Sequence, residues 1–125
     1  MHALIIEDNF LIATLIEEEL RDLGYSSCKL CDSEEQAIAS AVEQCPDLIT
    51  ADDKIVGSGV EAVRAICADR VVPVVFIVGS PQELKSPVPY SAMIAKPFGG
   101  RSVRQAVVEA LKLAKAHGYH PPAMA

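Results

Sequence analysis

Short apolar runs alternate with longer segments of helical spacing along the chain, and this alternation constrains the fold most strongly. The apolar runs cover residues 3–6, 48–51, 73–78 and 92–95, and residues 26–30 can form a further strand. Segments whose apolar residues recur every three or four positions cover residues 11–23, 34–44, 58–66 and 101–117. The first pattern predicts strands and the second predicts helices. Strands that alternate with helices in one small domain favour an α/β fold, with a five-stranded parallel sheet and helices on both faces.

Residues that end or start helices support these boundaries. Gly24 follows the first helical segment, where glycine commonly terminates a helix. Ser33 with Gln36, and Ser58 with Glu61, have the spacing of capping boxes, in which each side chain binds the backbone N–H group of the other residue. The sequence therefore predicts where the second and third helices begin.

The connection between the fourth and fifth predicted strands is an exception to the alternation. Residues 80–83 could start a helix, but Pro87 and Pro89 follow closely. Proline lacks a backbone N–H group and disfavours helical conformation in the residue before it. We therefore expect a shortened fourth helix of about one turn.

Length and composition narrow the classes of protein. The 125 residues suit one domain, which we expect over residues 1–118, followed by a tail over 119–125. Half of the residues are hydrophobic and 22% are charged, as in globular proteins. The sequence has no apolar run of membrane-spanning length and no secretory signal pattern. We expect a cytoplasmic protein without a membrane partner, whose four cysteines are reduced.

The formal net charge of −6 is unevenly distributed. Residues 1–62 carry 14 acidic and 3 basic side chains, whereas residues 63–125 carry 3 acidic and 8 basic ones. Nucleic-acid binding depends on neutralising phosphates with lysine and arginine. The acidic balance therefore argues against a nucleic-acid partner.

Charged side chains follow three of the predicted strands. Glu7 and Asp8 follow the first, Asp52 and Asp53 end the third, and Lys96 follows the fifth. Because the carboxyl ends of parallel strands meet at one edge of the sheet, we expect these side chains to converge. Converging carboxylates repel one another unless a cation lies among them, and oxygen ligands favour Mg²⁺. A metal ion, a carboxylate and a lysine together suit phosphoryl transfer onto an aspartate.

The same positions carry a resemblance to a known family. The matching segments are Glu7-Asp8, Pro46-Asp47-Leu48-Ile49-Thr50-Ala51-Asp52, Pro73-Val74-Val75-Phe76 and Lys96-Pro97-Phe98. Together they resemble the receiver domain of two-component response regulators over nearly the whole chain. The resemblance implies a flavodoxin-like receiver fold with strand order 2-1-3-4-5 and a cis peptide bond between Lys96 and Pro97. Within the family, residues 76–77, 80–84 and 96–98 are most similar to receivers of bacterial general-stress-response regulators and their single-domain relatives.

The resemblance also implies a role for each residue at the strand ends. Asp52 would accept a phosphoryl group from a sensor histidine kinase or a phosphotransfer protein. Asp8, Asp52 and the backbone carbonyl of Lys54 would bind Mg²⁺, and Glu7 would act through a metal-bound water. Lys96 would pair with the phosphoryl oxygens. We expect a stand-alone receiver that catalyses only its own phosphorylation and dephosphorylation and signals through protein contacts.

Two positions depart from the family pattern. Val78 stands where receivers usually have threonine or serine, and Met93 stands at the position of the switch aromatic. Ser80 could supply a hydroxyl, although a loop serine is more often simply solvated. Tyr90 could supply an aromatic ring, although surface placement is the simpler interpretation. These departures suggest an altered output switch and leave two alternatives open: a pseudo-receiver that binds proteins independently of phosphorylation, and a small Mg²⁺-dependent phosphatase.

One face of the last predicted helix is basic. At 100° per residue a single stripe contains Arg101, Arg104, Val108, Lys112 and Lys115. A solvated charged face is the default interpretation, and a docking surface for an acidic partner is the alternative. The sequence identifies no downstream partner, and we expect a monomer.

Two further patterns have ordinary explanations that involve no functional site. Cys28 and Cys31 have the spacing of half a zinc site, but no second pair of ligands accompanies them. We therefore expect no metal there. His2, His117 and His120 lie near the chain ends, which suggests surface histidines.

Overall fold

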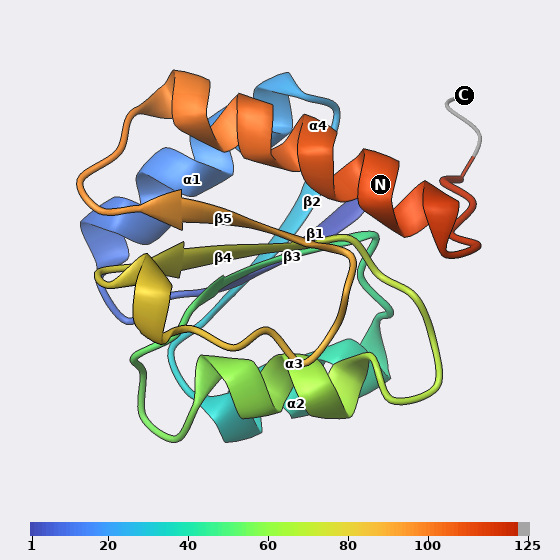
Figure 1. Ribbon diagram of the computed structural model, residues 1–125, viewed down its shortest axis with the longest axis horizontal. Coiled ribbons are helices and arrows are strands. Elements are labelled where there is room, and N and C mark those ends of the chain that lie inside the picture. Colours follow the sequence, from blue (N-terminus) through green and yellow to red (C-terminus); the bar gives the residue numbers. More distant parts are fainter. Residues whose placement is uncertain (123–125) are drawn as a thin grey trace.

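The computed structural model describes residues 1–122 and shows a five-stranded parallel sheet between two layers of helices (Figure 1). The strands are β1 (His2–Ile6), β2 (Ser27–Cys31), β3 (Leu48–Asp52), β4 (Val74–Val78) and β5 (Ser91–Ala95). The helices are α1 (Phe10–Asp22), α2 (Glu34–Glu43), α3 (Gly59–Ile66) and α4 (Gly100–Ala116). The strand order is β2-β1-β3-β4-β5, which confirms the predicted fold class and topology.

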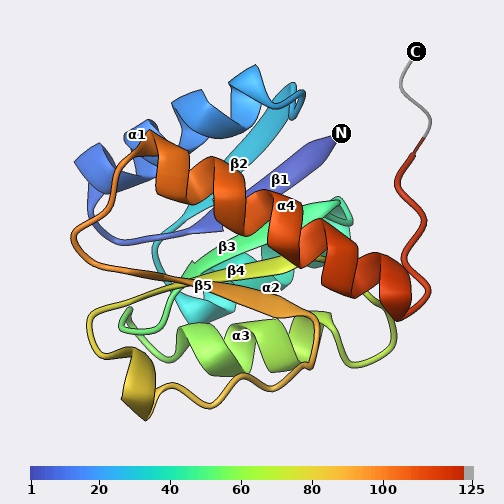
Figure 2. The ribbon, with the colours of Figure 1, turned by 45° about the horizontal axis from the view of Figure 1, so that its top comes forward.

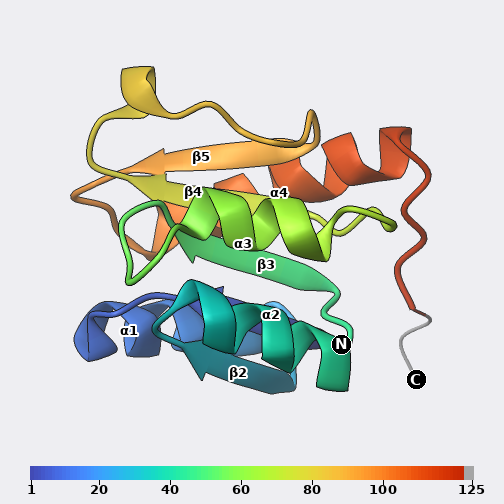
Figure 3. The same ribbon diagram turned by 90° about the horizontal axis from the view of Figure 1, so that it is seen from below.

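The sheet separates two apolar cores (Figures 2 and 3). Successive strand residues point to opposite faces, so that Ala3 and Ile5 face α1 and α4, whereas Leu4 and Ile6 face α2 and α3. All residues of β1, β3 and β4 are buried. Their continuous apolar sequences follow from this burial on both faces.

The strand register determines which residues meet at the carboxyl edge of the sheet. Ile6 lies beside Ala51, and Asp52 lies beside Ile77. The residues that leave β1, β3 and β5 therefore emerge at the same edge, as the sequence predicted.

The serines predicted as helix caps fill that role. The Ser33 side chain accepts a hydrogen bond from the Gln36 N–H group, and Ser58 accepts one from Glu61, each at 3.2 Å. Both predicted capping boxes are only half formed. The Gln36 side chain accepts instead from the Asp32 N–H group, and the Ser58 N–H group donates instead to the Glu34 carboxylate, each at 2.9 Å.

The connection between β4 and β5 contains a single 3₁₀ turn, η1 (Pro81–Glu83), as expected. The expectation of a surface position for Tyr90 is wrong, because the residue is only 6% exposed. Its hydroxyl donates to the backbone carbonyl of Arg70 at 3.4 Å, and its ring lies 5.5 Å from that of His117. Tyr90 therefore joins the start of β5 to the end of α4.

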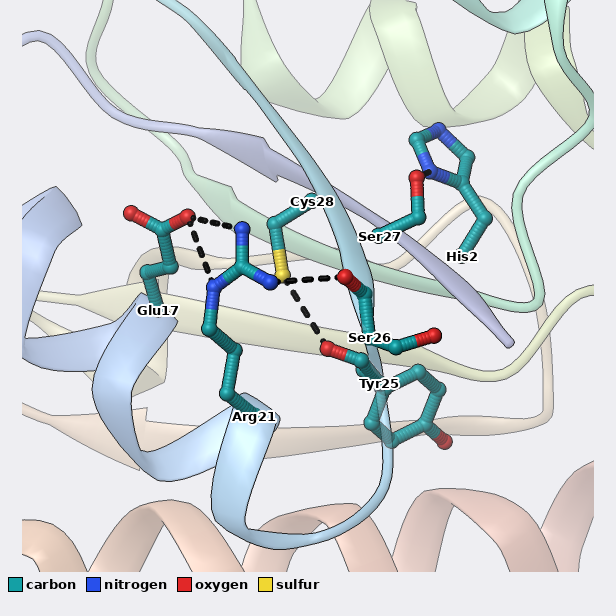
Figure 4. Close-up of polar contacts among 7 residues, drawn as sticks. All are labelled: His2, Glu17, Arg21, Tyr25, Ser26, Ser27 and Cys28. Carbon is teal, nitrogen blue, oxygen red and sulfur yellow. Dashed lines mark hydrogen bonds and ion pairs between the residues drawn. The ribbon is translucent and has the colours of Figure 1, made fainter.

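The expectation for His2 is also wrong, whereas His117 and His120 are exposed as expected. His2 begins β1, one residue earlier than the sequence indicated, and pairs with Ser27 of β2. Its ring Nδ1 lies 2.8 Å from the Ser27 hydroxyl (Figure 4), and its backbone N–H group donates to Asp47 at 2.7 Å. Pairing within the sheet thus buries this histidine.

A polar contact fixes the connection from α1 to β2 (Figure 4). The Arg21 guanidinium pairs with Glu17 at 2.8 Å and donates to the backbone carbonyl of Ser26 at 2.6 Å. Gly24 turns the chain there with φ of 105°, a conformation that glycine adopts readily.

Cys28 and Cys31 cannot bind one ion together, because they pack against opposite faces of the sheet. All four cysteines of the chain lie within the described residues, and all are free thiols.

The predicted tail lies partly outside the described residues, which end at 122. Within them, the Tyr119 hydroxyl donates to the backbone carbonyl of Asp47 at 3.2 Å. Among the helices of residues 1–122, none has the length and apolar character needed to cross a membrane.

Burial of His2 predicts a dependence of stability on pH. Burial lowers the pKa of His2, so the unfolded chain takes up a proton more readily than the folded protein. The free energy of unfolding should therefore fall as the pH drops below about 6.5. In urea unfolding at two pH values on either side of this point, the unaltered protein should lose more stability than His2→Asn. Equal losses would contradict the prediction.

Candidate functional site

Three carboxylates meet at the carboxyl edge of the sheet. Glu7 and Asp8 directly follow β1, and Asp52 ends β3. Each of the three carboxylates has an oxygen that lies within 4.8 Å of an oxygen of the other two. Glu7 and Asp52 are 4% and 2% exposed, whereas Asp8 is exposed. The predicted cluster is therefore present, and two of its members are nearly withdrawn from solvent.

Two donors hold the Asp52 carboxylate. The Lys54 backbone N–H group donates to Oδ1 at 2.9 Å, and the Lys96 ammonium donates to Oδ2 at 2.6 Å. Lys96 follows β5, and the peptide bond between Lys96 and Pro97 is cis, as the family resemblance implied. The lysine thus links β5 to β3 across the intervening β4.

Glu7 has an unsatisfied oxygen in the same pocket. Its Oε1 accepts from the Asn9 N–H group at 3.2 Å, whereas its buried Oε2 has no hydrogen-bond partner among residues 1–122. Burial, with the nearby Asp52 carboxylate, raises the pKa of Glu7 to about 8. The pocket is therefore electrostatically costly in the absence of a cation.

The groups around Asp52 favour its ionised form. Burial acts to raise the pKa of Asp52, but the neighbouring Glu7 side chain, which keeps its proton, the Lys96 ammonium and the Lys54 N–H group together lower it below its usual value. Asp53 is half-buried, and its pKa is raised by burial and by Asp52. The cluster thus contains one carboxylate firmly held as an anion.

These residues fit a hard divalent cation. Such ions bind carboxylate and carbonyl oxygens, and Mg²⁺ uses only a few protein ligands. The buried, partnerless Oε2 of Glu7 lies in a cluster whose carboxylates repel one another. The donor set at the pocket therefore matches Mg²⁺ in type and charge.

Close packing fixes the backbone beneath the acidic cluster. Gly59 begins α3 and lies directly against the backbone carbonyl oxygen of Asp52. A β-carbon at position 59 would collide with that oxygen. Glycine therefore lets α3 approach the end of β3.

The residues discussed as switch positions lie in different surroundings. Val78 is fully buried in the core beneath α2 and α3. Ser80 is half-buried, and its backbone carbonyl accepts from the Glu83 N–H group at 3.0 Å. Met93 is 42% exposed on β5. The side chain at the end of β4 is thus a hydrocarbon packed into the core.

All members of the basic stripe on α4 are exposed, as predicted: Arg101, Arg104, Val108, Lys112 and Lys115. Arg104 already has a partner, because its Nε lies 2.7 Å from the Glu19 carboxylate on α1. This ion pair ties the stripe to the neighbouring helix.

Sequence analysis missed an exposed apolar surface beside the pocket. Phe10, Leu11 and Leu15 on α1 are 74%, 74% and 58% exposed. Phe10 lines a hollow of about 240 Å³ together with Glu7 and Asp8. The sequence contained a signal for it, because apolar residues at 10, 11, 12, 15 and 16 form a stripe too wide for one buried helix face.

Comparison with known families agrees with this geometry. Residues 3–108 match the family model described as "Response regulator receiver domain". The chain belongs to this family. Receivers interact with histidine kinases, and the acidic cluster of Glu7, Asp8 and Asp52 corresponds to the receiver pocket.

Individual receivers show the same relationship. The chain is 34% identical over 114 residues to the phyllosphere-induced regulator PhyR of Methylorubrum extorquens, covering 86% of this chain but 42% of that protein. It also resembles the response regulator PhyR of Brucella abortus, with a TM-score of 0.81, 29% identity, and coverage of 93% and 49% of the two chains. For the receiver domain of Erythrobacter litoralis PhyR the TM-score is 0.79 at 29% identity, and the match covers 99% of this chain and 95% of that one. This receiver thus spans about half the length of full PhyR chains.

Packing against Asp52 predicts a cost for enlarging Gly59. Gly59→Ala should lower the free energy of unfolding by about 1–3 kcal/mol, because the added methyl group must displace the Asp52 backbone. Gly79→Ala is the matched control, since a β-carbon there meets no atom of the described residues within 4 Å, and its effect should stay within about 0.5 kcal/mol. Urea unfolding measures both. Equal stability of the two variants would contradict the packing argument.

Proposed function

We propose that this receiver accepts a phosphoryl group on Asp52 from the phosphohistidine of a sensor histidine kinase or phosphotransfer protein. The observation that carries the proposal is the 2.6 Å contact between the Lys96 ammonium and the Asp52 carboxylate, beside two further carboxylates. A carboxylate kept ionised and held by two donors is a suitable nucleophile for phosphorus. The alternative phosphatase lacks a comparable supporting observation.

In the proposed transfer, an oxygen of the Asp52 carboxylate attacks the phosphorus atom. The new O–P bond forms as the N–P bond breaks, and the bonding electrons go to the histidine nitrogen of the donor, which takes up a proton. The Lys54 N–H group and the Lys96 ammonium orient the carboxylate before the attack. Lys96 then offsets negative charge on the acyl phosphate.

The proposal includes one Mg²⁺ ion. We assign its protein ligands to the carboxylates of Asp8 and Asp52 and the backbone carbonyl of Lys54, with Glu7 beside them. When bound, the ion supplies positive charge that offsets the charge of the phosphoryl group. The fold brings the three carboxylates together and excludes bulk water from Glu7 and Asp52.

A small phosphodonor tests this function directly. Intact-protein mass should increase by one phosphoryl unit after incubation with the donor and Mg²⁺. The increase should disappear with a chelator or in Asp52→Asn, because the ligand set or the nucleophile is then lost.

Asp53→Asn provides the matched control and should still gain the phosphoryl unit, because its side chain lies outside the proposed ligand set. A gain that survives in Asp52→Asn would refute the assignment of the acceptor. Failure of the unaltered protein with the small donor and with a panel of kinases would instead support the pseudo-receiver.

We further propose that the histidine donor docks on the exposed apolar residues of α1. A phosphohistidine can reach Asp52 only if its protein covers the carboxyl edge of the sheet. Phe10, Leu11 and Leu15 lie on the helix that leaves this edge, and Phe10 shares a hollow with Glu7 and Asp8. Exposed apolar side chains in such a position are typical of protein interaction surfaces.

Leu15→Asp should separate docking from chemistry. Transfer from a cognate kinase should slow by about tenfold or more, because a charge enters an apolar contact and a tenfold change is about 1.4 kcal/mol. Phosphorylation by a small donor should not change. Val42→Asp is the control, since Val42 is 82% exposed on α2, on the other face of the sheet. Equal slowing of kinase transfer in both variants would refute docking on α1.

The output of the proposed receiver is expected to differ from the family pattern. A buried valine at position 78 offers no hydroxyl to a phosphoryl group, and Met93 replaces the usual switch aromatic. We propose a monomeric cytoplasmic regulator, related to the general stress response, that signals through protein contacts. The exposed basic residues on α4 remain the proposed surface for an acidic downstream partner.

A further inference from the structure

The start of α2 lies beside the loop that follows Asp52 (Figure 3) and is hydrogen-bonded to it. The backbone N–H group of Glu34 donates to the Val56 carbonyl at 3.0 Å, and Ser33 forms a parallel bridge with Val56. The Glu34 carboxylate then accepts from the Ser58 N–H group at 2.9 Å. Backbone and side chain of one residue thus hold both ends of a short stretch of the loop.

Gly57 lies between these two bonds and shows how closely Glu34 packs. Its φ is +86°, a conformation that glycine adopts without strain. A β-carbon at this position would approach the Glu34 Cβ to 2.7 Å and its Oε1 to 2.9 Å. The loop can therefore press directly against the Glu34 side chain only because residue 57 is glycine.

The restrained loop carries a donor to the acidic cluster. Residues 53–57 connect Asp52 to the N-cap of α3, and the Lys54 N–H group within them donates to Asp52 Oδ1 at 2.9 Å. The other end of the loop is fixed because Ser58 caps α3 and Gly59 lies against the Asp52 backbone. The position of Lys54 therefore depends on contacts made several residues further along the chain.

We propose that Glu34 is a positioning residue for the Asp52 pocket, acting through residues 53–57 on the Lys54 backbone. This proposal rests on the proposed function, because Lys54 is assigned there both as donor to Asp52 and as a carbonyl ligand of Mg²⁺. Glu34 itself touches neither the ion nor the phosphoryl group. Its carboxylate accepts the hydrogen bond that the Ser58 N–H group would otherwise make to solvent.

The test compares Glu34→Ala with Glu34→Gln and Glu35→Ala. Glutamine retains an oxygen that can accept from Ser58, and Glu35 is an exposed neighbour on the same turn of α2. Mg²⁺ affinity is measured by titration, following the backbone amide signals of Asp53 and Lys54. Loss of residues that orient metal ligands typically weakens binding by about 10–100-fold. Because Glu34 acts through the loop, we expect about tenfold weaker binding for Glu34→Ala and near-normal binding for the other two variants.

A second measurement is made without metal. Hydrogen exchange at the Lys54 amide should accelerate in Glu34→Ala and remain near normal in Glu34→Gln and Glu35→Ala, because the bond to Asp52 Oδ1 opens more often when the loop is released. Urea unfolding of all variants separates this effect from a general loss of stability.

The outcomes distinguish the two proposals. If Glu34→Ala is destabilised but matches Glu35→Ala in both Mg²⁺ affinity and Lys54 exchange, Glu34 is only structural and the inference is wrong. If the unaltered protein binds no Mg²⁺, the proposed function fails, and Lys54 exchange alone then decides whether Glu34 positions the loop. Failure of Glu34→Gln to restore either property would show that hydrogen bonding by the Glu34 side chain is not the cause.

Discussion

The ion pair between Asp52 and Lys96 is the interaction on which the carboxyl edge of the sheet depends. Asp52 is nearly fully buried, and a buried carboxylate is strongly unfavourable unless it is paired and hydrogen-bonded. Lys96 supplies the charge and the Lys54 N–H group supplies a further bond. Since these donors come from the end of β5 and from the loop after β3, the pair connects segments separated by β4 in the sheet. Removing one partner would leave the other charge uncompensated.

Much of the fold follows from local sequence patterns. The apolar runs located β1, β3 and β4 because these strands are buried on both faces, and the strand-end positions placed Glu7, Asp52 and Lys96 together. Pattern analysis failed where tertiary contacts decide the environment of a side chain. Tyr90 is buried by packing against the end of α4, and that contact leaves no periodic signal in the sequence.

The candidate site was predictable to a different extent. The acidic residues were found because each directly follows or ends a strand. The role proposed for Glu34 could not be predicted from the sequence, because its contacts with Val56 and Ser58 depend on how α2 and α3 lie beside each other. The exposed residues of α1 were missed for a related reason. Helical spacing shows that a face is apolar, but only the neighbouring helices determine how much of that face is covered.

His2 and Asp47 make contact at the end of the sheet opposite to the acidic cluster. These residues lie at the amino end of β1 and before β3, where backbone pairing and the Tyr119 hydroxyl join the first and last parts of the described chain. The acidic cluster lies at the opposite end of the same strands, about 16 Å away for a strand of five residues. One end of the sheet therefore anchors the chain while the other holds the acidic cluster, and sequence changes at the anchoring end can alter stability without moving the carboxylates.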